Sequence, residues 1–449
     1  MTKNLYMVSL GCPKNLVDSE VMLALLEDDG YVVCQEPEQA DLLLVNTCGF
    51  IQPAVEEAID EIIHLGQYKD NRAGVKLVVT GCLVQRYGKD LPAELPEVDL
   101  FVGVDGFHNI AALVRQLAKE TGSVILPASR FLMNAAMPRK LATPPHRAYL
   151  KISEGCSNRC SYCLIPSIRG PLRSRPMDDL AAEAGRLAAA GVRELTLVGQ
   201  DVTAYGLDLG KGKASLPALI AAILANCRAD WIRLLYLYPN RIGDELLALM
   251  AGEERLLNYL DIPLQHISSR VLKKMNRPFT SSKAHALIER IRSKVPDAAI
   301  RTTFIVGFPG ETDSDVEEIA DFLRTYRLNN VGIFPYANEE GCAAEHFADQ
   351  CEDKVKQERY DYLMELQAGI SLEKNREFVG RKVPVLVEGL SRESDLLLEG
   401  RTTFQAPEID GCVYIADGVC GVGDIVMVEI TEAHPYDLVG VLVDAAPPA

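Results

Sequence analysis

The chain has no long apolar run, no recognisable leader and no excess of positive charge in its 449 residues. A membrane-spanning helix needs about 20 consecutive apolar residues, and no stretch approaches that length. The N-terminus has one short apolar run without a small-residue cleavage site, so we expect a first strand there and not a signal peptide. The sequence therefore predicts a cytoplasmic protein with no membrane partner.

The charge balance is acidic, with a formal net charge of −17 at pH 7. A protein that binds nucleic acid needs a basic face to meet the phosphates, so this balance argues against such a partner and fits a basic protein partner better. A negative charge also keeps a protein soluble, and both explanations stay open. The length is enough for two or three domains with sizeable cores.

Cysteine, by contrast, is abundant, with twelve residues. Disulfides are rare in a reducing compartment, where cysteine clusters more often bind metal or carry out redox chemistry. Two sets of three stand out. One set is closely spaced and the other is dispersed, and they are Cys156, Cys160 and Cys163, and Cys12, Cys48 and Cys82.

The first 130 residues alternate apolar strand-like segments, at 5–11, 41–50, 76–83 and 99–103, with amphipathic helical segments. This alternation predicts a parallel α/β sheet. The three dispersed cysteines fall at or just past the ends of the first three of these strands. Ligands bind at the carboxyl edge of open α/β sheets, so we expect these cysteines to converge there.

Residues 131–147 contain three prolines and no clear periodicity, and we interpret them as a linker. Residues 148–377 contain six more strand–helix units, which predict a partial (β/α)6 barrel with its functional loops after the strands. The strands are expected at 148–155, 194–201, 231–239, 259–266, 300–310 and 329–337. From 378 to 449 the segments are short strands separated by Gly and Asp turns, which predict a small antiparallel β-barrel.

The closely spaced set forms the pattern Cys-x3-Cys-x2-Cys after the first strand of the predicted barrel. A structural zinc site uses four ligands, commonly in two separated pairs. A thioredoxin-like redox site uses a single Cys-x-x-Cys. Three thiolates on an iron–sulfur cluster leave one iron without a protein ligand. Such an open iron can bind a small chelating substrate, so the pattern favours a reactive cluster.

This motif resembles that of the radical S-adenosylmethionine (SAM) enzymes in its spacing, its preceding strand and the aromatic Tyr162. The resemblance implies that Cys156, Cys160 and Cys163 carry the catalytic 4Fe-4S cluster and that SAM binds its open iron. One electron then cleaves SAM, and the resulting radical abstracts hydrogen from an unactivated C–H bond. Such chemistry needs a cluster at the low end of the range of reduction potentials.

The end of the second barrel strand, Gly199, Gln200 and Asp201, resembles the family's segment that contacts the SAM amino group. A turn and a helix cap would explain the same residues equally well. The glycine-rich segment 307–312 lacks the Lys and Ser/Thr of a phosphate loop, so we interpret it as a tight turn beside the SAM pocket.

The dispersed cysteines, each beside a glycine, extend the resemblance to the methylthiotransferases over nearly the whole chain. That family combines an N-terminal domain with three spaced cysteines, a radical SAM barrel and a C-terminal TRAM β-domain. The resemblance implies that Cys12, Cys48 and Cys82 ligate a second 4Fe-4S cluster that carries the sulfur. The other cysteines match no motif and are expected to be structural; they are Cys34, Cys227, Cys342, Cys351, Cys412 and Cys420.

The segments 8–20 and 163–176 resemble the RimO-type branch, which modifies an aspartate β-carbon in small-subunit ribosomal protein uS12. Residues 381–449 contain four Arg/Lys and twelve Asp/Glu, a net charge of −8 that suits a basic target. The resemblance also implies a sulfur donor and a reductant such as flavodoxin or ferredoxin. Methylthiolation of adenosine in transfer RNA, and a non-catalytic iron–sulfur carrier or scaffold, stay open as alternatives.

Overall fold

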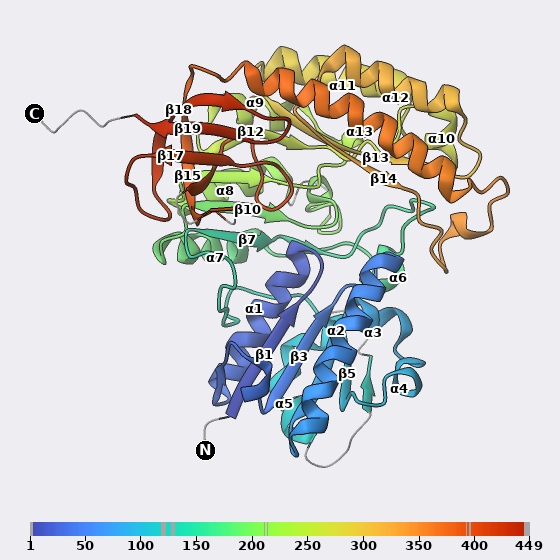
Figure 1. The fold of residues 1–449 in the computed structure, drawn as a ribbon, viewed down its shortest axis with the longest axis vertical. Coiled ribbons are helices and arrows are strands. Elements are labelled where there is room, and N and C mark those ends of the chain that lie inside the picture. The colour runs from blue at the N-terminus through green and yellow to red at the C-terminus, as the bar shows by residue number, and fades with distance from the viewer. Residues whose placement is uncertain are drawn as a thin grey trace, which may run out of the picture.

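A computed structural model describes residues 3–117, 123–126, 131–210, 212, 214–391, 393–394 and 397–443. Residues 1–2, 118–122, 127–130 and 444–449, which the predicted domains include, lie outside the described residues. The chain forms two six-stranded parallel sheets and one closed five-stranded barrel. In Figure 1 the N-terminal sheet (blue) lies below the central sheet, and the C-terminal barrel (red) lies at the left. No helix within the described residues is long and apolar enough to cross a membrane.

The N-terminal sheet has the strand order β2-β1-β3-β4-β5-β6 and is parallel throughout. Its strands are β1 (Lys3–Ser9), β2 (Tyr31–Val33), β3 (Leu42–Thr47), β4 (Lys76–Gly81), β5 (Leu100–Gly103) and β6 (Ser123–Ile125). The predicted parallel sheet is confirmed. Strands β2 and β6 were not predicted, because three residues are too few to show a periodic pattern.

Helices and short turns cover both faces of this sheet (Figure 1). They are α1 (Pro13–Asp28), α2 (Gln52–Asn71), α3 (Cys82–Tyr87), α4 (Leu91–Glu94), α5 (Ile110–Gln116), η1 (Pro37–Gln39) and η2 (Val104–Asn109). All six residues of β3 are buried, as expected for a strand covered on both faces. A β-strand with no exposed face has no polar alternation, which is why the first four residues of β3 (42–45) are all apolar.

The central sheet has the order β14-β13-β12-β11-β10-β7 and is also parallel, so the predicted partial six-stranded barrel is confirmed. Its strands are β7 (Arg147–Lys151), β10 (Glu194–Val198), β11 (Trp231–Leu234), β12 (Leu256–Asp261), β13 (Ala299–Val306) and β14 (Asn330–Pro335). A separate antiparallel pair, β8 (Ser153–Glu154) and β9 (Arg173–Ser174), follows β7.

All helices of the central domain except α6 lie on the outside of this sheet, whereas the short α6 (Ile165–Ile168) packs beside α3 of the N-terminal domain (Figure 1). The others are α7 (Met177–Ala189), α8 (Leu216–Asn226), α9 (Asp244–Gly252), α10 (Ser269–Lys274), α11 (Ser281–Lys294), α12 (Asp313–Tyr326) and α13 (Asp353–Arg376), with the turns η3 (Val202–Ala204), η4 (Pro239–Arg241) and η5 (Ala343–His346). Helix α12 begins with a capping box formed by Thr312 and Asp315, which satisfies amides at its N-terminus.

The C-terminal domain is a closed barrel with the order β15-β16-β17-β19-β18, which confirms the predicted small β-barrel. The strands are β15 (Lys382–Leu390), β16 (Leu398–Thr402), β17 (Val413–Asp417), β18 (Ile425–Ala433) and β19 (Leu438–Leu442). Four pairings are antiparallel, but β17 and β19 pair in parallel. Strand β18 crosses to pair with β15, so β19 returns antiparallel to β18 and closes the barrel alongside β17.

Buried charges attach this barrel to the N-terminal ends of the central strands. Glu194, the first residue of β10, pairs with both Arg233 and Arg401, and neither Glu194 nor Arg233 is exposed. Tyr259 of β12 donates a hydrogen bond to Asp410 at 2.7 Å. The C-terminal domain therefore closes the end of the partial barrel that lies opposite the carboxyl edge of its strands.

Candidate active site

The three dispersed cysteines follow three strands that are neighbours in the N-terminal sheet. Cys12 is the N-cap of α1 after β1, Cys48 follows β3, and Cys82 is the first residue of α3 directly after β4. Strands β1, β3 and β4 pair side by side. The parallel direction therefore brings all three thiols to one carboxyl edge, which is where such sheets bind ligands.

Glycines allow these cysteine loops to approach one another closely. Gly11 has φ +90°, and a Cβ atom there would lie 2.8 Å from the Cβ atom of Cys48. Gly81 has φ +104°, and its Cβ atom would lie 2.5 Å from the Thr47 carbonyl oxygen. Any larger residue at either position would push the cysteine loops apart, so the sequence pattern of glycine beside cysteine has a steric cause.

The closely spaced cysteines lie on the loop between β8 and β9. The amide of Cys156 donates to the Gly170 carbonyl at 3.0 Å, and the amide of Cys163 donates to the Cys160 carbonyl at 3.2 Å. Gly155 has φ +70°, and a Cβ atom there would lie 2.2 Å from the carbonyl oxygen of Pro171. These contacts fix the loop as a tight turn after the first barrel strand.

Both sets of cysteines line a single cavity of about 350 Å³. The cavity is open to the carboxyl ends of the strands of both parallel sheets, and its lining includes Tyr162, Gln200 and Asp201. Gly199 is absent from the lining, as is the predicted turn at 307–312. The two sets, separated by more than 70 residues of sequence, thus face each other across one space.

The predicted SAM-contacting residues differ in how far their polar atoms are engaged. Asp201 is 3 % exposed and caps η3, accepting hydrogen bonds from the Ala204 amide at 3.1 Å and from the Thr203 hydroxyl at 2.6 Å. Its other oxygen accepts from Asn158 at 2.8 Å. Asp201 therefore has the structural cap role that its sequence position also allowed.

Gln200 is different, because its buried Oε1 atom has no hydrogen-bond partner among the described residues. Gln265, which also lines the cavity and has φ +71°, likewise has a buried Oε1 atom without a partner there. Buried polar atoms are almost always hydrogen-bonded, so an unpartnered pair of acceptors in one cavity is typical of a ligand site. Gln265 was not predicted, although it lies one residue before the end of the predicted strand 259–266.

Tyr162 and Arg277 lie beside the closely spaced cysteines. Arg277 donates to the Tyr162 hydroxyl at 3.3 Å and to the Pro263 carbonyl at 2.7 Å, and its guanidinium lies 3.9 Å from the Cys160 sulfur. Burial raises the pKa of Tyr162 well above its usual range, so the hydroxyl stays neutral. Arg277, which was not predicted, supplies a buried positive charge to this side of the cavity.

Arg169 links the two halves of the site. It is 1 % exposed and pairs with Asp18 of α1 at 3.2 Å and with Glu154 at 3.0 Å. Lys151 of β7 also pairs with Asp18, and with Glu154 at 2.8 Å. This buried network holds helix α1 of the N-terminal domain against the loop that carries Cys156, Cys160 and Cys163. Sequence spacing gave no signal for it, because its members lie far apart in the chain.

Burial raises the pKa of the Cys82 thiol to about 11 and that of the Cys163 thiol to about 12. Cys12 behaves differently: burial would raise its pKa, but the nearby Lys14 and Arg169 cations lower it overall. Thiols with raised pKa values are protonated at neutral pH. Metal ligands must be deprotonated, so loading of metal at these thiols would release protons.

The donor set suits iron–sulfur clusters. Within the described residues, no three His, Cys, Asp or Glu side chains are placed to hold a single metal ion. Thiolates are the preferred ligands of iron–sulfur clusters, and each set supplies three thiols to a cavity whose glycines leave room at the cysteine loops. The residues present therefore fit a 4Fe-4S cluster at each set.

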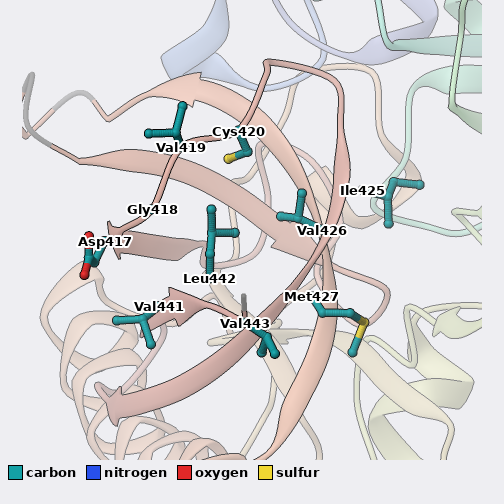
Figure 2. Close-up of a pocket in the computed structure, with 10 residues that line it drawn as sticks. All are labelled: Asp417, Gly418, Val419, Cys420, Ile425, Val426, Met427, Val441, Leu442 and Val443. Carbon is teal, nitrogen blue, oxygen red and sulfur yellow. The ribbon is translucent and has the colours of Figure 1, made fainter. Parts of the chain in front are cut away.

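The remaining six cysteines do not line this cavity. Cys227 and Cys342 are buried, and four others are half-buried. Cys420 lines a separate hollow of about 680 Å³ on the C-terminal barrel, among mostly apolar residues (Figure 2). Cys420 is the one cysteine among the described residues that line this hollow, whereas all six cysteines of the two sets line the cavity between the parallel sheets.

Three family models match the chain. Uncharacterized protein family UPF0004 matches residues 4–103, the radical SAM superfamily matches 150–323, and the TRAM domain matches 379–443. Each match lies inside one of the predicted domains, whose boundaries stay predictions. The radical SAM superfamily implies a 4Fe-4S cluster and SAM as cofactors.

Curated relatives are similar over nearly their full length. The ribosomal protein uS12 methylthiotransferase RimO of Desulfotalea psychrophila is 53% identical, with 97% of this chain and 98% of that protein covered. The protein of the same name from Geobacter sulfurreducens is 46% identical, with 97% and 98% covered.

Solved structures share the fold at low identity. The radical SAM methyltransferase TsrM from Kitasatospora setae has a TM-score of 0.53 at 15% identity, with 74% of this chain and 73% of that chain covered. The cobalamin-dependent SAM radical enzyme OxsB also has a TM-score of 0.53, at 13% identity, with 82% and 56% covered. The high identity to the curated relatives, together with the three matching domains, shows that the chain belongs to the RimO family of radical SAM methylthiotransferases.

Proposed function

We propose that this enzyme transfers a methylthio group to the β-carbon of an aspartate in ribosomal protein uS12. The observation that carries the proposal is the single cavity lined by two separate sets of three cysteines. A radical SAM reaction by itself needs only one such set. A second set facing the first across the same space fits an enzyme that must bring a sulfur atom to the carbon that has lost hydrogen.

The assignment of each set follows from its position. Cys156, Cys160 and Cys163 would hold the cluster that binds SAM, and the set on the N-terminal sheet would hold a second 4Fe-4S cluster. When bound, the clusters and SAM supply a radical for C–H activation and a sulfur for transfer. The chain itself keeps the two sets at a fixed separation, because Arg169 and Lys151 bind Asp18 of α1 from the barrel side.

The unpartnered oxygens of Gln200 and Gln265 support SAM binding at the barrel side of the cavity. Each is an acceptor, and the amino group of SAM is a donor. Tyr162 would pack beside the same group, held by its hydrogen bond from Arg277. Asp201 would act indirectly by shaping the loop that presents Gln200, since its own oxygens already accept hydrogen bonds.

The target is proposed to meet the C-terminal domain. Its net charge of −8 suits a basic ribosomal protein, and opposite charges speed encounter. The hollow in Figure 2 adds apolar surface, with Val419 98% and Met427 46% exposed and Asp417 at its rim. A protein that modifies uS12 would work in the cytoplasm, with a reductant such as flavodoxin or ferredoxin and a sulfur donor.

The experiment compares single cysteine variants after anaerobic reconstitution. Wild type should bind about eight irons per chain, and Cys163→Ala and Cys82→Ala should each bind about four. Cys163→Ala should stop the reductive cleavage of SAM. Cys82→Ala should still cleave SAM but leave uS12 unmodified by mass spectrometry. Cys34→Ala is the matched control, because Cys34 is a half-buried cysteine of the N-terminal domain outside the cavity.

Three outcomes would contradict the proposal. If wild type binds about four irons and Cys82→Ala binds the same number, the chain does not hold a second cluster. If folded Cys82→Ala enzyme modifies uS12 at the wild-type rate, the N-terminal cysteines do not carry the sulfur and have only a structural role. If the enzyme methylthiolates transfer RNA and leaves uS12 unmodified, its substrate is adenosine in transfer RNA, and the proposed target is wrong.

A further inference from the structure

Lys14 is a buried cation in the cavity without a carboxylate partner. Its side chain lies in the first turn of α1, two residues after Cys12, and the residue is 7% exposed. Its ammonium lies 3.6 Å from the centre of the Tyr236 ring. Among the described residues it makes no ion pair with Asp or Glu. A buried charge is normally paired, so Lys14 is a candidate for a ligand anion.

The other cations that line the cavity are already engaged. Arg169 pairs with Asp18 and Glu154, and Arg301 lies 3.3 Å from both Asp261 and Asp410. Their charge is therefore balanced within the protein.

Arg277 has no carboxylate partner, but it is bound to Tyr162 and Pro263 and lies beside Cys160, on the SAM side of the cavity. Lys14 is thus the cation on the opposite side, next to the N-terminal cysteines, that has no carboxylate partner among the described residues.

The chemistry of the target indicates what this cation meets. This inference rests on the proposed function, in which the reacting atom is the β-carbon of an aspartate. That carbon is bonded directly to the carbon of the side-chain carboxylate. That carboxylate must enter the cavity together with the reacting carbon and must come close to the sulfur-carrying side. We propose that Lys14 binds the side-chain carboxylate of the target aspartate and so selects aspartate over its neutral analogue asparagine.

Tyr236 holds Lys14 in place for this role. The tyrosine follows β11, has φ +61°, and its amide donates to the Asp261 carboxylate at 2.9 Å. Its carbonyl accepts from the Val202 amide at 3.1 Å. The ring is therefore fixed by the barrel domain, although Lys14 belongs to the N-terminal domain. An aromatic face attracts the ammonium without neutralising it, which leaves the charge available to an incoming carboxylate.

The test measures binding by the reconstituted full-length enzyme. The dissociation constants of uS12 and of a uS12 variant with asparagine at the target position are compared by fluorescence anisotropy. Wild type should prefer the aspartate form by at least about tenfold, since a buried charge pair that loses one partner is weakened by that much or more. Lys14→Met keeps the side-chain length and should reduce the preference to less than about twofold, whereas Lys14→Arg should keep most of it.

Lys89→Met is the matched control, because Lys89 is an exposed lysine of the same domain outside the cavity. Iron content is measured for each variant, and Lys14→Gln replaces Lys14→Met if the latter loses iron. A Lys14 variant with full iron content that still prefers aspartate tenfold overturns this inference alone. A wild type that neither binds nor modifies uS12 overturns the proposed function, and this inference with it. Loss of preference in Lys14→Met, with Lys89→Met behaving like wild type, supports it.

Discussion

Glu194→Gln should loosen the attachment of the C-terminal barrel to the central domain. Glu194 is fully buried and pairs with Arg233 of β11 and with Arg401 of β16. Burial would raise the pKa of Glu194, but the two guanidinium groups lower it to about 2 from its usual 4.5. That difference corresponds to about 3 kcal/mol of folding free energy at neutral pH.

The substitution leaves two buried cations short of one negative charge. Arg401 keeps Glu388, whereas Arg233 keeps the Thr402 and Thr403 carbonyl oxygens and the face of the Tyr259 ring but no carboxylate among the described residues. Breaking a buried pair by removing one partner typically costs about 3 to 5 kcal/mol, which agrees with the value from the pKa. We therefore expect the free energy of unfolding to fall by about 3 kcal/mol.

The assay is urea unfolding followed by tryptophan fluorescence. Trp231 is the single tryptophan of the chain; it is buried and lies in β11, two residues before Arg233. Its emission therefore reports on the strand that carries the broken pair. Glu317→Gln is the matched control, because Glu317 pairs with Arg324 on the exposed surface and its loss should barely move the transition.

The pH dependence gives a second check. The folded-state pKa of Glu194 is depressed, so its contribution is fully present above about pH 4.5 and is lost as the pH falls toward about 2. The difference between wild type and Glu194→Gln should therefore shrink over that range. A change in unfolding free energy below about 1 kcal/mol at neutral pH would refute the view that this network joins the domains.

Three further changes have separate readouts. Gly81→Ala should lower the free energy of unfolding by about 1 to 3 kcal/mol and reduce the iron bound by the N-terminal cysteines, because its Cβ atom would lie 2.5 Å from the Thr47 carbonyl oxygen. Gly191→Ala is the control, since Gly191 has φ +103° and a Cβ atom there would have nothing within 4 Å. It should lower the free energy of unfolding by only about 1 kcal/mol and leave the iron content unchanged. Arg277→Leu should make the potential of the barrel cluster more negative, on the order of tens of millivolts in an EPR-monitored titration, because a cation beside Cys160 is removed; an unchanged potential would contradict this. Asp417→Lys should raise the dissociation constant for uS12 several-fold at low salt and less at high salt, and equal weakening at both would point away from charge.

Local sequence patterns were enough to predict the fold class. The alternation of apolar strands with amphipathic helices predicted two parallel sheets, because a strand covered on both faces is mainly apolar, as residues 42–45 of β3 are. The strand-end positions of Cys12, Cys48 and Cys82 predicted their convergence, since parallel neighbouring strands end at the same edge. Short strands between glycine and aspartate turns predicted the C-terminal barrel.

Only the tertiary structure decided how these parts meet. Periodicity describes one element at a time, whereas the parallel pairing of β17 with β19 depends on where β18 crosses the barrel. The shared cavity, the pairing of Arg169 with Asp18 and the position of Lys14 over the Tyr236 ring depend on contacts between residues more than a hundred positions apart. A single sequence carries no signal for such contacts, because each side chain alone is compatible with an ordinary surface or core position. The two cysteine sets could thus be identified from local sequence, whereas the position of Lys14 beside the N-terminal cysteines depends on how the two domains pack together.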